Sequence, residues 1–182
     1  MRKAFTLMEI NLAILVMAGG ILSICGLFSL GYRESRQSTE DVEAAAYADA
    51  VISPIVMAVS APTLKWSNLQ NLSSKPSDQG WRDYLDTDGT VKSNPEATAR
   101  AAFSSVLGAL GVSDVNSTWP ENAKGELKAA GLVVTHEQGS GVVKISFRAC
   151  KNPAMLMSAP IFYAEARYEG YDESVDNGGG GN

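Results

Sequence analysis

The sequence is poor in the residues that most often carry catalysis. Its 182 residues include two cysteines and one histidine, His136. It has no Gly-x-Ser-x-Gly elbow and no Walker or dinucleotide-binding glycine loop. The stretch HEQGS at His136 lacks the second histidine of a zinc helix, and nothing near Cys150 in the sequence would activate its thiol. We therefore expect no enzyme activity and no cofactor, with His136 and Cys150 in structural roles.

Basic residues are also scarce. Lys and Arg total 15 against 20 Asp and Glu, which gives a net charge of −5. Proteins that bind nucleic acid neutralise phosphates with clustered Lys and Arg, and no such cluster is present, so nucleic acid is not an expected partner. Cys25 lies in an apolar run and Cys150 in the distant polar part, so we expect no intrachain disulfide. Two cysteines are too few to indicate a redox compartment.

What the sequence does contain is a long apolar run near its N-terminus. No residue from Ile10 to Leu30 is charged. A helix over this run is about 32 Å long at about 1.5 Å per residue, close to the roughly 30 Å hydrocarbon thickness of a membrane. Arg2 and Lys3 precede the run and, by the positive-inside bias, hold the N-terminus in the cytoplasm. We therefore predict a transmembrane helix at about 10–30.

Three interpretations of this run are open. A cleavable secretory signal has an apolar stretch of only about 7–15 residues before its cleavage site, and this run is longer. A plain signal anchor explains the length and the flanking charges. It does not explain the carboxylate of Glu9 at the start of the run, although at a helix end that side chain could snorkel to the headgroups. The third interpretation rests on the residues around Glu9.

The stretch KAFTLMEINLAIL, residues 3–15, resembles the class III leader and first turns of type IV pilins and type II secretion pseudopilins. That family has a short basic leader, a Gly, a Phe or Met, then Thr-Leu, an aliphatic residue, Glu and an apolar helix. Here Met1–Ala4 would be the leader, Phe5 the new N-terminus, and the residues TLME after it fit the next four positions. The resemblance covers residues 1–30, under a fifth of the chain.

The resemblance implies a processing route. A membrane prepilin peptidase would cut between Ala4 and Phe5 and N-methylate Phe5, leaving the apolar helix on the protein. The family usually has Gly where this chain has Ala4, so we expect cleavage to be possible but slower. In pilin-like assemblies Glu9 would pair with the terminal amine of Phe5 in a neighbouring subunit, which gives the carboxylate a counter-charge in a dry bundle.

The resemblance also implies a function and a location. The chain would be a structural subunit of a type IV pilus-like or type II secretion pseudopilus filament, polymerised through its N-terminal helix. Its partners would be the prepilin peptidase, other pilin or pseudopilin subunits and an inner-membrane assembly platform. It would cross the inner membrane once, with a cytoplasmic N-terminus and a periplasmic or, in the filament, extracellular head. The alternatives are a signal-anchored binding domain that does not polymerise and a secreted enzyme with an atypical site.

After residue 30 an amphipathic stripe predicts that the helix continues. Its apolar positions recur at three- and four-residue steps: Val42, Ala45, Ala48, Ile52, Ile55, Val56 and Val59. We predict one long helix over 5–60, which Pro54 kinks or ends early. Glycines at 19, 20 and 26 either allow close approach of neighbouring helices or reflect the ordinary glycine content of membrane helices.

Residues 61–170 are predicted to form a globular head. Its first part, 62–93, has the composition of loops and turns, with a hairpin turn at Asp88-Gly89. Some pseudopilins bind calcium, and Asp83, Asp86 and Asp88 are the candidate ligands here. Their spacing is not that of an EF-hand loop, and turn chemistry explains these aspartates, so we expect no metal site. The three tryptophans either form a ligand surface or anchor packing.

The remainder predicts an α+β head. Asn94 as N-cap, Pro95 at the first position and Gly111 as a stop indicate a second helix, and a short helix is predicted near 126–130. Strands are predicted over 132–136, 142–148 and 161–168, the first two as a hairpin. A long N-terminal helix packed against a small antiparallel sheet and a second helix matches the pilin-like fold. The acidic, Gly-rich tail 171–182 is predicted to be disordered.

Overall fold

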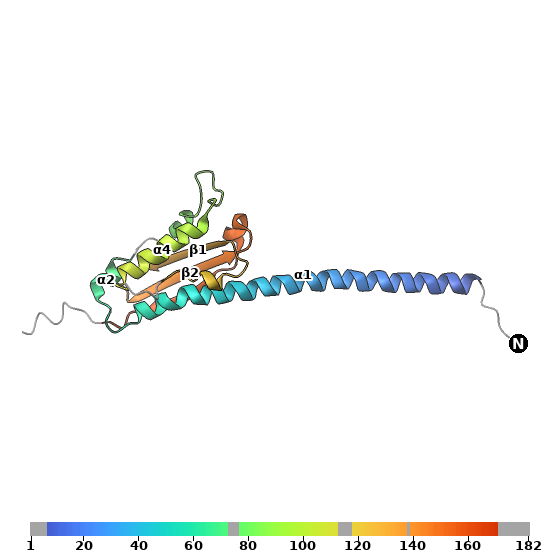
Figure 1. Cartoon of the computed structure of the whole chain (residues 1–182), viewed down its shortest axis with the longest axis horizontal. Coiled ribbons are helices and arrows are strands. Elements are labelled where there is room, and N and C mark those ends of the chain that lie inside the picture. The colour runs from blue at the N-terminus through green and yellow to red at the C-terminus, as the bar shows by residue number, and fades with distance from the viewer. Residues whose placement is uncertain (1–6, 73–76, 113–117, 138, 171–182) are drawn as a thin grey trace, which may run out of the picture. The chain divides into compact units, whose positions relative to one another are not determined.

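The computed structural model of the chain describes residues 7–72, 77–112, 118–137 and 139–170 (Figure 1). The predicted leader Met1–Ala4, its cleavage position at Phe5 and the tail 171–182 lie outside the described residues. The fold is α+β, as predicted, with a long N-terminal helix, a three-stranded antiparallel sheet and additional helices. The chain divides into two compact units, Met1–Asp41 and Val42–Asn182.

Helix α1 spans Leu7–Val59 and is 53 residues long. It contains one segment long and apolar enough to cross a membrane, and none of that segment is buried within the chain. The long helix predicted from the sequence is therefore confirmed, with Leu7 as its first described residue. Pro54 lies inside α1 and does not end it, since a proline removes only one backbone donor and the helix continues to Val59.

The sheet has the order β1-β2-β3, formed by Ala129–His136, Val142–Cys150 and Phe162–Arg167. Both pairings are antiparallel. The three predicted strands are confirmed with shifted ends, but the short helix predicted near 126–130 is wrong. Strand β1 begins at Ala129, which pairs with Cys150, and the nearby helical turn is η1, Glu121–Ala123. The local helix propensity of alanine is overridden there by strand pairing.

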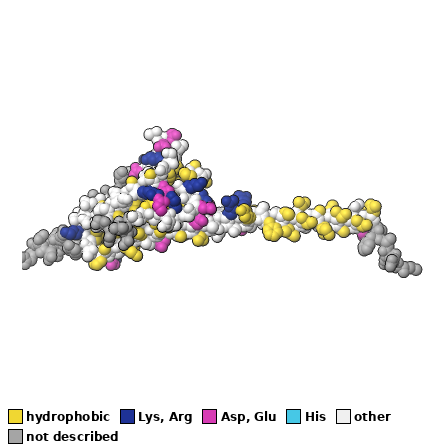
Figure 2. All heavy atoms as spheres, viewed as in Figure 1, with side chains coloured by type: hydrophobic (Ala, Val, Ile, Leu, Met, Phe, Trp, Pro, Cys, Tyr) yellow, Lys and Arg dark blue, Asp and Glu magenta, His cyan; other side chains and the backbone are white. Residues whose placement is uncertain are grey.

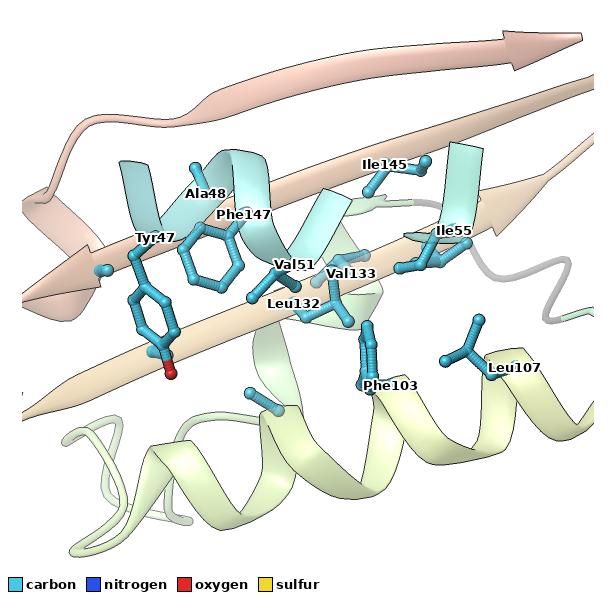
Figure 3. Packing of buried hydrophobic residues seen from close by; sticks show 14 of the residues in the cluster. Tyr47, Ala48, Val51, Ile55, Phe103, Leu107, Leu132, Val133, Ile145 and Phe147 are labelled. Carbon is cyan, nitrogen blue, oxygen red and sulfur yellow. The ribbon is translucent and has the colours of Figure 1, made fainter. Parts of the chain in front are cut away.

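The core lies between the sheet, α1 and helix α4, Pro95–Ala109 (Figure 3). Val51 and Ile55 of α1 point toward the sheet and toward Phe103 of α4, and all three are fully buried. The buried stripe of α1 differs from the predicted one and consists of Ala44, Tyr47, Ala48, Val51, Ile55, Ala58 and Val59. Val42, predicted as core, is 66% exposed. Facing Tyr47 and Val51 inward buries more apolar surface than facing Val42 and Ala45 inward.

The cap of α4 follows the sequence prediction. The Asn94 side chain accepts a hydrogen bond from the backbone N–H of Ala97 at 3.1 Å, and Pro95 is the first helical residue. Gly111, just past the end, has φ +77°, a left-handed conformation that favours glycine. The inward face of α4 consists of Ala99, Phe103 and Leu107, so the cap fixes a helix that carries part of the core.

Replacing Asn94 with alanine should lower the free energy of unfolding by about 1 kcal/mol, because one of the first backbone N–H groups of α4 loses its acceptor. The measurement is chemical denaturation of the full chain in detergent, followed by tryptophan fluorescence. The control is Ser104→Ala, an exposed change in the middle of the same helix, for which the change should stay within about 0.5 kcal/mol. Equal stability of the two variants would contradict the capping role.

Residues 62–93 contain more structure than the sequence indicated. Two short helices, α2 (Trp66–Gln70) and α3 (Ser77–Arg82), occupy a region predicted as loop. Gly80 lets α3 approach β1, because a Cβ at this position would lie 2.5 Å from Cγ1 of Val133. The predicted turn at Asp88-Gly89 is present, with Gly89 at φ +82° and an antiparallel bridge between Leu85 and Val91.

Candidate functional site

The candidate assembly segment is the first unit of the chain, where α1 begins. Ala4 and Phe5, the predicted cleavage and methylation positions, lie outside the described residues. Glu9 lies in the first turn of α1 and is exposed. A carboxylate in a first turn interacts favourably with the positive end of the helix dipole, typically by about 0.3–1 kcal/mol. The structure therefore places the acidic group where it also stabilises the start of the helix.

A local role for Glu9 was missed by the sequence reasoning, although its signal was present. The order Thr6-Leu7-Met8-Glu9 is that of a capping box, in which a Glu or Gln side chain three residues after a Ser or Thr reaches back to the backbone. Glu9 at the third position of α1 fits the second half of that motif. Glutamine can also perform this capping role, so a Glu9→Gln substitution removes the charge and keeps the cap.

The apolar part of α1 presents side chains to its surroundings along its length (Figure 2). Its two serines do not interrupt this surface, because Ser23 and Ser29 donate to the carbonyls of Gly19 and Gly26 within the helix, both at 2.9 Å. Apart from the adjoining residues and the backbone of the same helical turns, no atom of the described residues would lie within 4 Å of a Cβ at the glycines of this segment, Gly19, Gly20, Gly26 and Gly31. Nothing inside the described chain therefore requires glycine there.

A shallow apolar groove lies on the same unit. It is lined by Ile24, Leu27, Phe28, Gly31 and Tyr32. The gap is left by Gly31, which has no side chain between two aromatic neighbours. Just beyond it, the guanidinium carbon of Arg36 lies 5.8 Å from the centre of the Tyr32 ring. Apolar surface and the first charged turns of α1 are thus adjacent on one helix.

Of the three candidate calcium ligands, Asp88 uses its carboxylate in turn formation. Oδ1 of Asp88 accepts hydrogen bonds from the backbone N–H and the hydroxyl of Thr90, at 2.9 and 2.6 Å. The hydroxyl bond, more than the backbone one, lowers the pKa of Asp88. Asp83 and Asp86 take part in the same turn through their backbone. Lys92 donates to the backbone carbonyl oxygen of Asp83 at 2.5 Å, and the backbone N–H of Asp86 donates to the carbonyl of Thr90. Across the described ranges no three His, Cys, Asp or Glu side chains gather to hold a metal.

The remaining chemistry-bearing residues of the head are engaged in packing. His136 is 2% exposed, its Nε2 lies 2.6 Å from the carbonyl oxygen of Ser140, and its ring meets the edge of Trp66. This contact closes the loop between β1 and β2. Cys150 is buried and its Sγ donates to the carbonyl of Asn152 at 3.1 Å. Neither cysteine forms a disulfide.

The tryptophans anchor the core and its outer layer. Trp119 packs edge-on against Tyr47 and Phe103, with ring centres 5.9 and 5.5 Å apart. Trp81 covers Gly131 of β1, where a Cβ would lie 2.6 Å from the indole, and the guanidinium of Arg148 stacks on Trp81 at 4.7 Å. These contacts assign Trp119 and Trp81 to packing and leave neither as a free ligand surface.

A cavity of about 180 Å³ lies beside β1 and α4, with Tyr84, Val106 and Val134 among its lining residues. This volume is smaller than the roughly 300–1,000 Å³ of typical ligand pockets.

A network of ion pairs connects the first turn of α4 to the 119–128 segment. In it, the largely buried Glu96 meets Arg100 at 2.6 Å and Lys124 at 3.3 Å.

No protein-family model, curated protein or solved structure matches the chain.

Proposed function

We propose that the chain is a structural subunit of a type IV pilus-like or type II secretion pseudopilus filament. In this proposal α1 holds the chain in the inner membrane, with its N-terminus in the cytoplasm, and copies polymerise through that helix. The observation that carries the proposal is Glu9 in the first turn of an exposed, membrane-length apolar helix, directly after the sequence AFTLM.

The charge of Glu9 supports the proposal. A charged side chain at the centre of a membrane helix costs about 2.5–3.5 kcal/mol on insertion scales, and less near an interface, so a lone subunit tolerates Glu9 at the edge. In a bundle of such helices the carboxylate leaves the interface and needs a counter-charge. Cutting before Phe5 creates a cationic amine four residues from Glu9 in sequence, and the amine of an adjacent copy supplies that counter-charge.

The head supports a structural role. His136, Cys150 and the Asp88 carboxylate are engaged in packing and turn formation, so the proposal assigns the chain no enzyme activity. The competing function is a signal-anchored binding domain that stays monomeric. The capping role available to Glu9 favours this alternative, because it gives the carboxylate a purpose without any neighbour.

Mass spectrometry of the mature N-terminus, on protein from its native host, separates the two. The proposal expects a chain that begins at Phe5 and carries an N-methyl group. An Ala4→Gly variant should be processed faster than the native chain, since the resemblance implies glycine before the cut. A mature chain that retains Met1, or one cut after the apolar run, would exclude the filament subunit.

A further inference from the structure

We propose that Arg36 of one copy pairs with Glu40 of an adjacent copy, forming a second charged contact between neighbouring α1 helices. This inference rests on the proposed function and names the surface and partner of the assembly helix after its apolar run. The partner is a second copy of this chain, with its α1 parallel to the first and displaced along the helix axis.

The charged groups at the two ends of the apolar run have the same spacing in the sequence. Glu9 stands four residues after Phe5, and Glu40 stands four residues after Arg36. Four residues of helix correspond to about 6 Å of axial rise. In both cases the cation precedes the anion, so the displacement has the same direction. A shift of the second copy by four residues therefore brings Arg36 level with Glu40, and it matches the sequence spacing of Phe5 and Glu9.

Other displacements are less favourable for the same charges. A shift of three residues would place Arg33 level with Arg36, which is a like-charge contact. A shift of four places Arg33 level with Gln37 and leaves no like charges level within this segment. The charged turns thus favour the displacement that the Glu9 pairing requires. They would fix the axial position of one helix relative to the other.

The surface of α1 beside Arg36 suits a second helix. Phe28, Tyr32, Arg36 and Glu40 follow one another at four-residue steps, so they form one ridge along the helix. The groove at Gly31 opens beside this ridge and can take an apolar side chain of the neighbour. The Tyr32 ring under the Arg36 guanidinium limits the freedom of that side chain. Apolar contact and ion pair therefore lie on one continuous face.

Pairing of Arg36 with Glu40 inside one helix is the competing explanation. At a spacing of four residues, an acidic residue before a basic one is the more favourable order, and here the order is reversed. A contact confined to one helix would also not depend on what the neighbouring copy carries. The two explanations therefore differ in how mixtures of variants behave.

The test uses the full chain in its native host, with Arg36→Glu and Glu40→Arg as single variants. The readout is the amount of chain in sheared filaments relative to the amount in the membrane. Each variant alone should lose about tenfold or more of its filament yield, because like charges then meet at every contact. Co-expression of the two variants should restore assembly to within about threefold of the native level, since residue 36 of each then meets an opposite charge at residue 40 of the other.

The mixture is decisive because both intrahelical pairs stay repulsive in it. Arg33→Glu is the matched control, with the same charge change one turn earlier, and it should change the yield by less than about twofold. Failure of the mixture to recover, or equal damage from Arg33→Glu and Arg36→Glu, would overturn the inference. If native filaments form from chains that begin at Phe5 while Arg36→Glu assembles normally, only this inference falls. If the native chain forms no filament, the proposed function falls with it.

Discussion

Replacing Tyr84 with phenylalanine should lower the free energy of unfolding of the head by about 2–4 kcal/mol, since two buried backbone groups lose their partner. Tyr84 is 1% exposed, and its hydroxyl donates to the carbonyl of Leu132 at 2.7 Å and accepts from the N–H of Leu132 at 2.8 Å. Strand β1 is at the edge of the sheet. The hydroxyl thus replaces the neighbouring strand that Leu132 lacks on that side.

The substitution isolates these hydrogen bonds from packing. Phenylalanine keeps the ring and removes only the oxygen, so the change creates almost no cavity. The matched control is Tyr163→Phe on β3, where the side chain is 55% exposed and its hydroxyl bonds Glu165; that change should cost less than about 0.5 kcal/mol. Denaturant unfolding of the full chain in detergent, followed by tryptophan fluorescence, measures both. A loss for Tyr84→Phe as small as for Tyr163→Phe would show that the edge of β1 does not depend on the hydroxyl.

The role of Tyr84 also shows what the sequence could not reveal. Its partner Leu132 is 48 residues away, and no local pattern connects a tyrosine in a turn region with a strand edge. The short helices α2 and α3 were missed for a related reason. Their segments have few helix-forming residues, and contacts with distant parts hold them, as Gly80 and Trp81 show against β1. Such elements depend on tertiary packing more than on propensity.

The features that were predicted have strong local signals. The apolar run and the continuous periodicity after it predicted α1, and Asn94-Pro95 predicted the start of α4 within a residue. The buried stripe of α1 was predicted in part, since it shares only Ala48, Ile55 and Val59 with the predicted one. Alanine and valine occur on several faces between 42 and 59, so periodicity alone did not distinguish the face that carries Tyr47 and Val51.

The candidate assembly site was predicted in part. Glu9 was identified from the residue order around it, and the structure adds its position in the first turn of the helix. The capping-box order at Glu9 and the four-residue spacing of Arg36 and Glu40 are both present in the sequence. Both depend on helical geometry, and the structure places the apolar run and the charged turns in one unbroken helix. The proposed pair of Arg36 and Glu40 joins two copies of the chain, so its signal lies in the order of charges along the helix.

In the proposed filament, replacing Glu9 with glutamine should reduce assembly by about a hundredfold, because breaking a dry ion pair by removing one charge costs about 3–5 kcal/mol. Glutamine has nearly the same shape and retains the capping function, so the helix should still start normally. Glu9→Lys should fail at least as strongly, since it places two cations together. Both variants should still insert in the membrane, because position 9 lies at the edge of the apolar run.

The charge of Glu9 is thereby separated from its capping role. The readouts are filament yield after shearing and the amount of chain in the membrane fraction, with Glu34→Gln as the matched control on the exposed, charged part of the same helix. That control should assemble like the native chain, because Glu34 has no level partner in the four-residue register. Normal assembly of Glu9→Gln would mean that Glu9 acts only within its own helix. In that case Glu9 would stabilise only the start of a membrane anchor, and the proposed pairing of Glu9 with a neighbouring copy would be wrong.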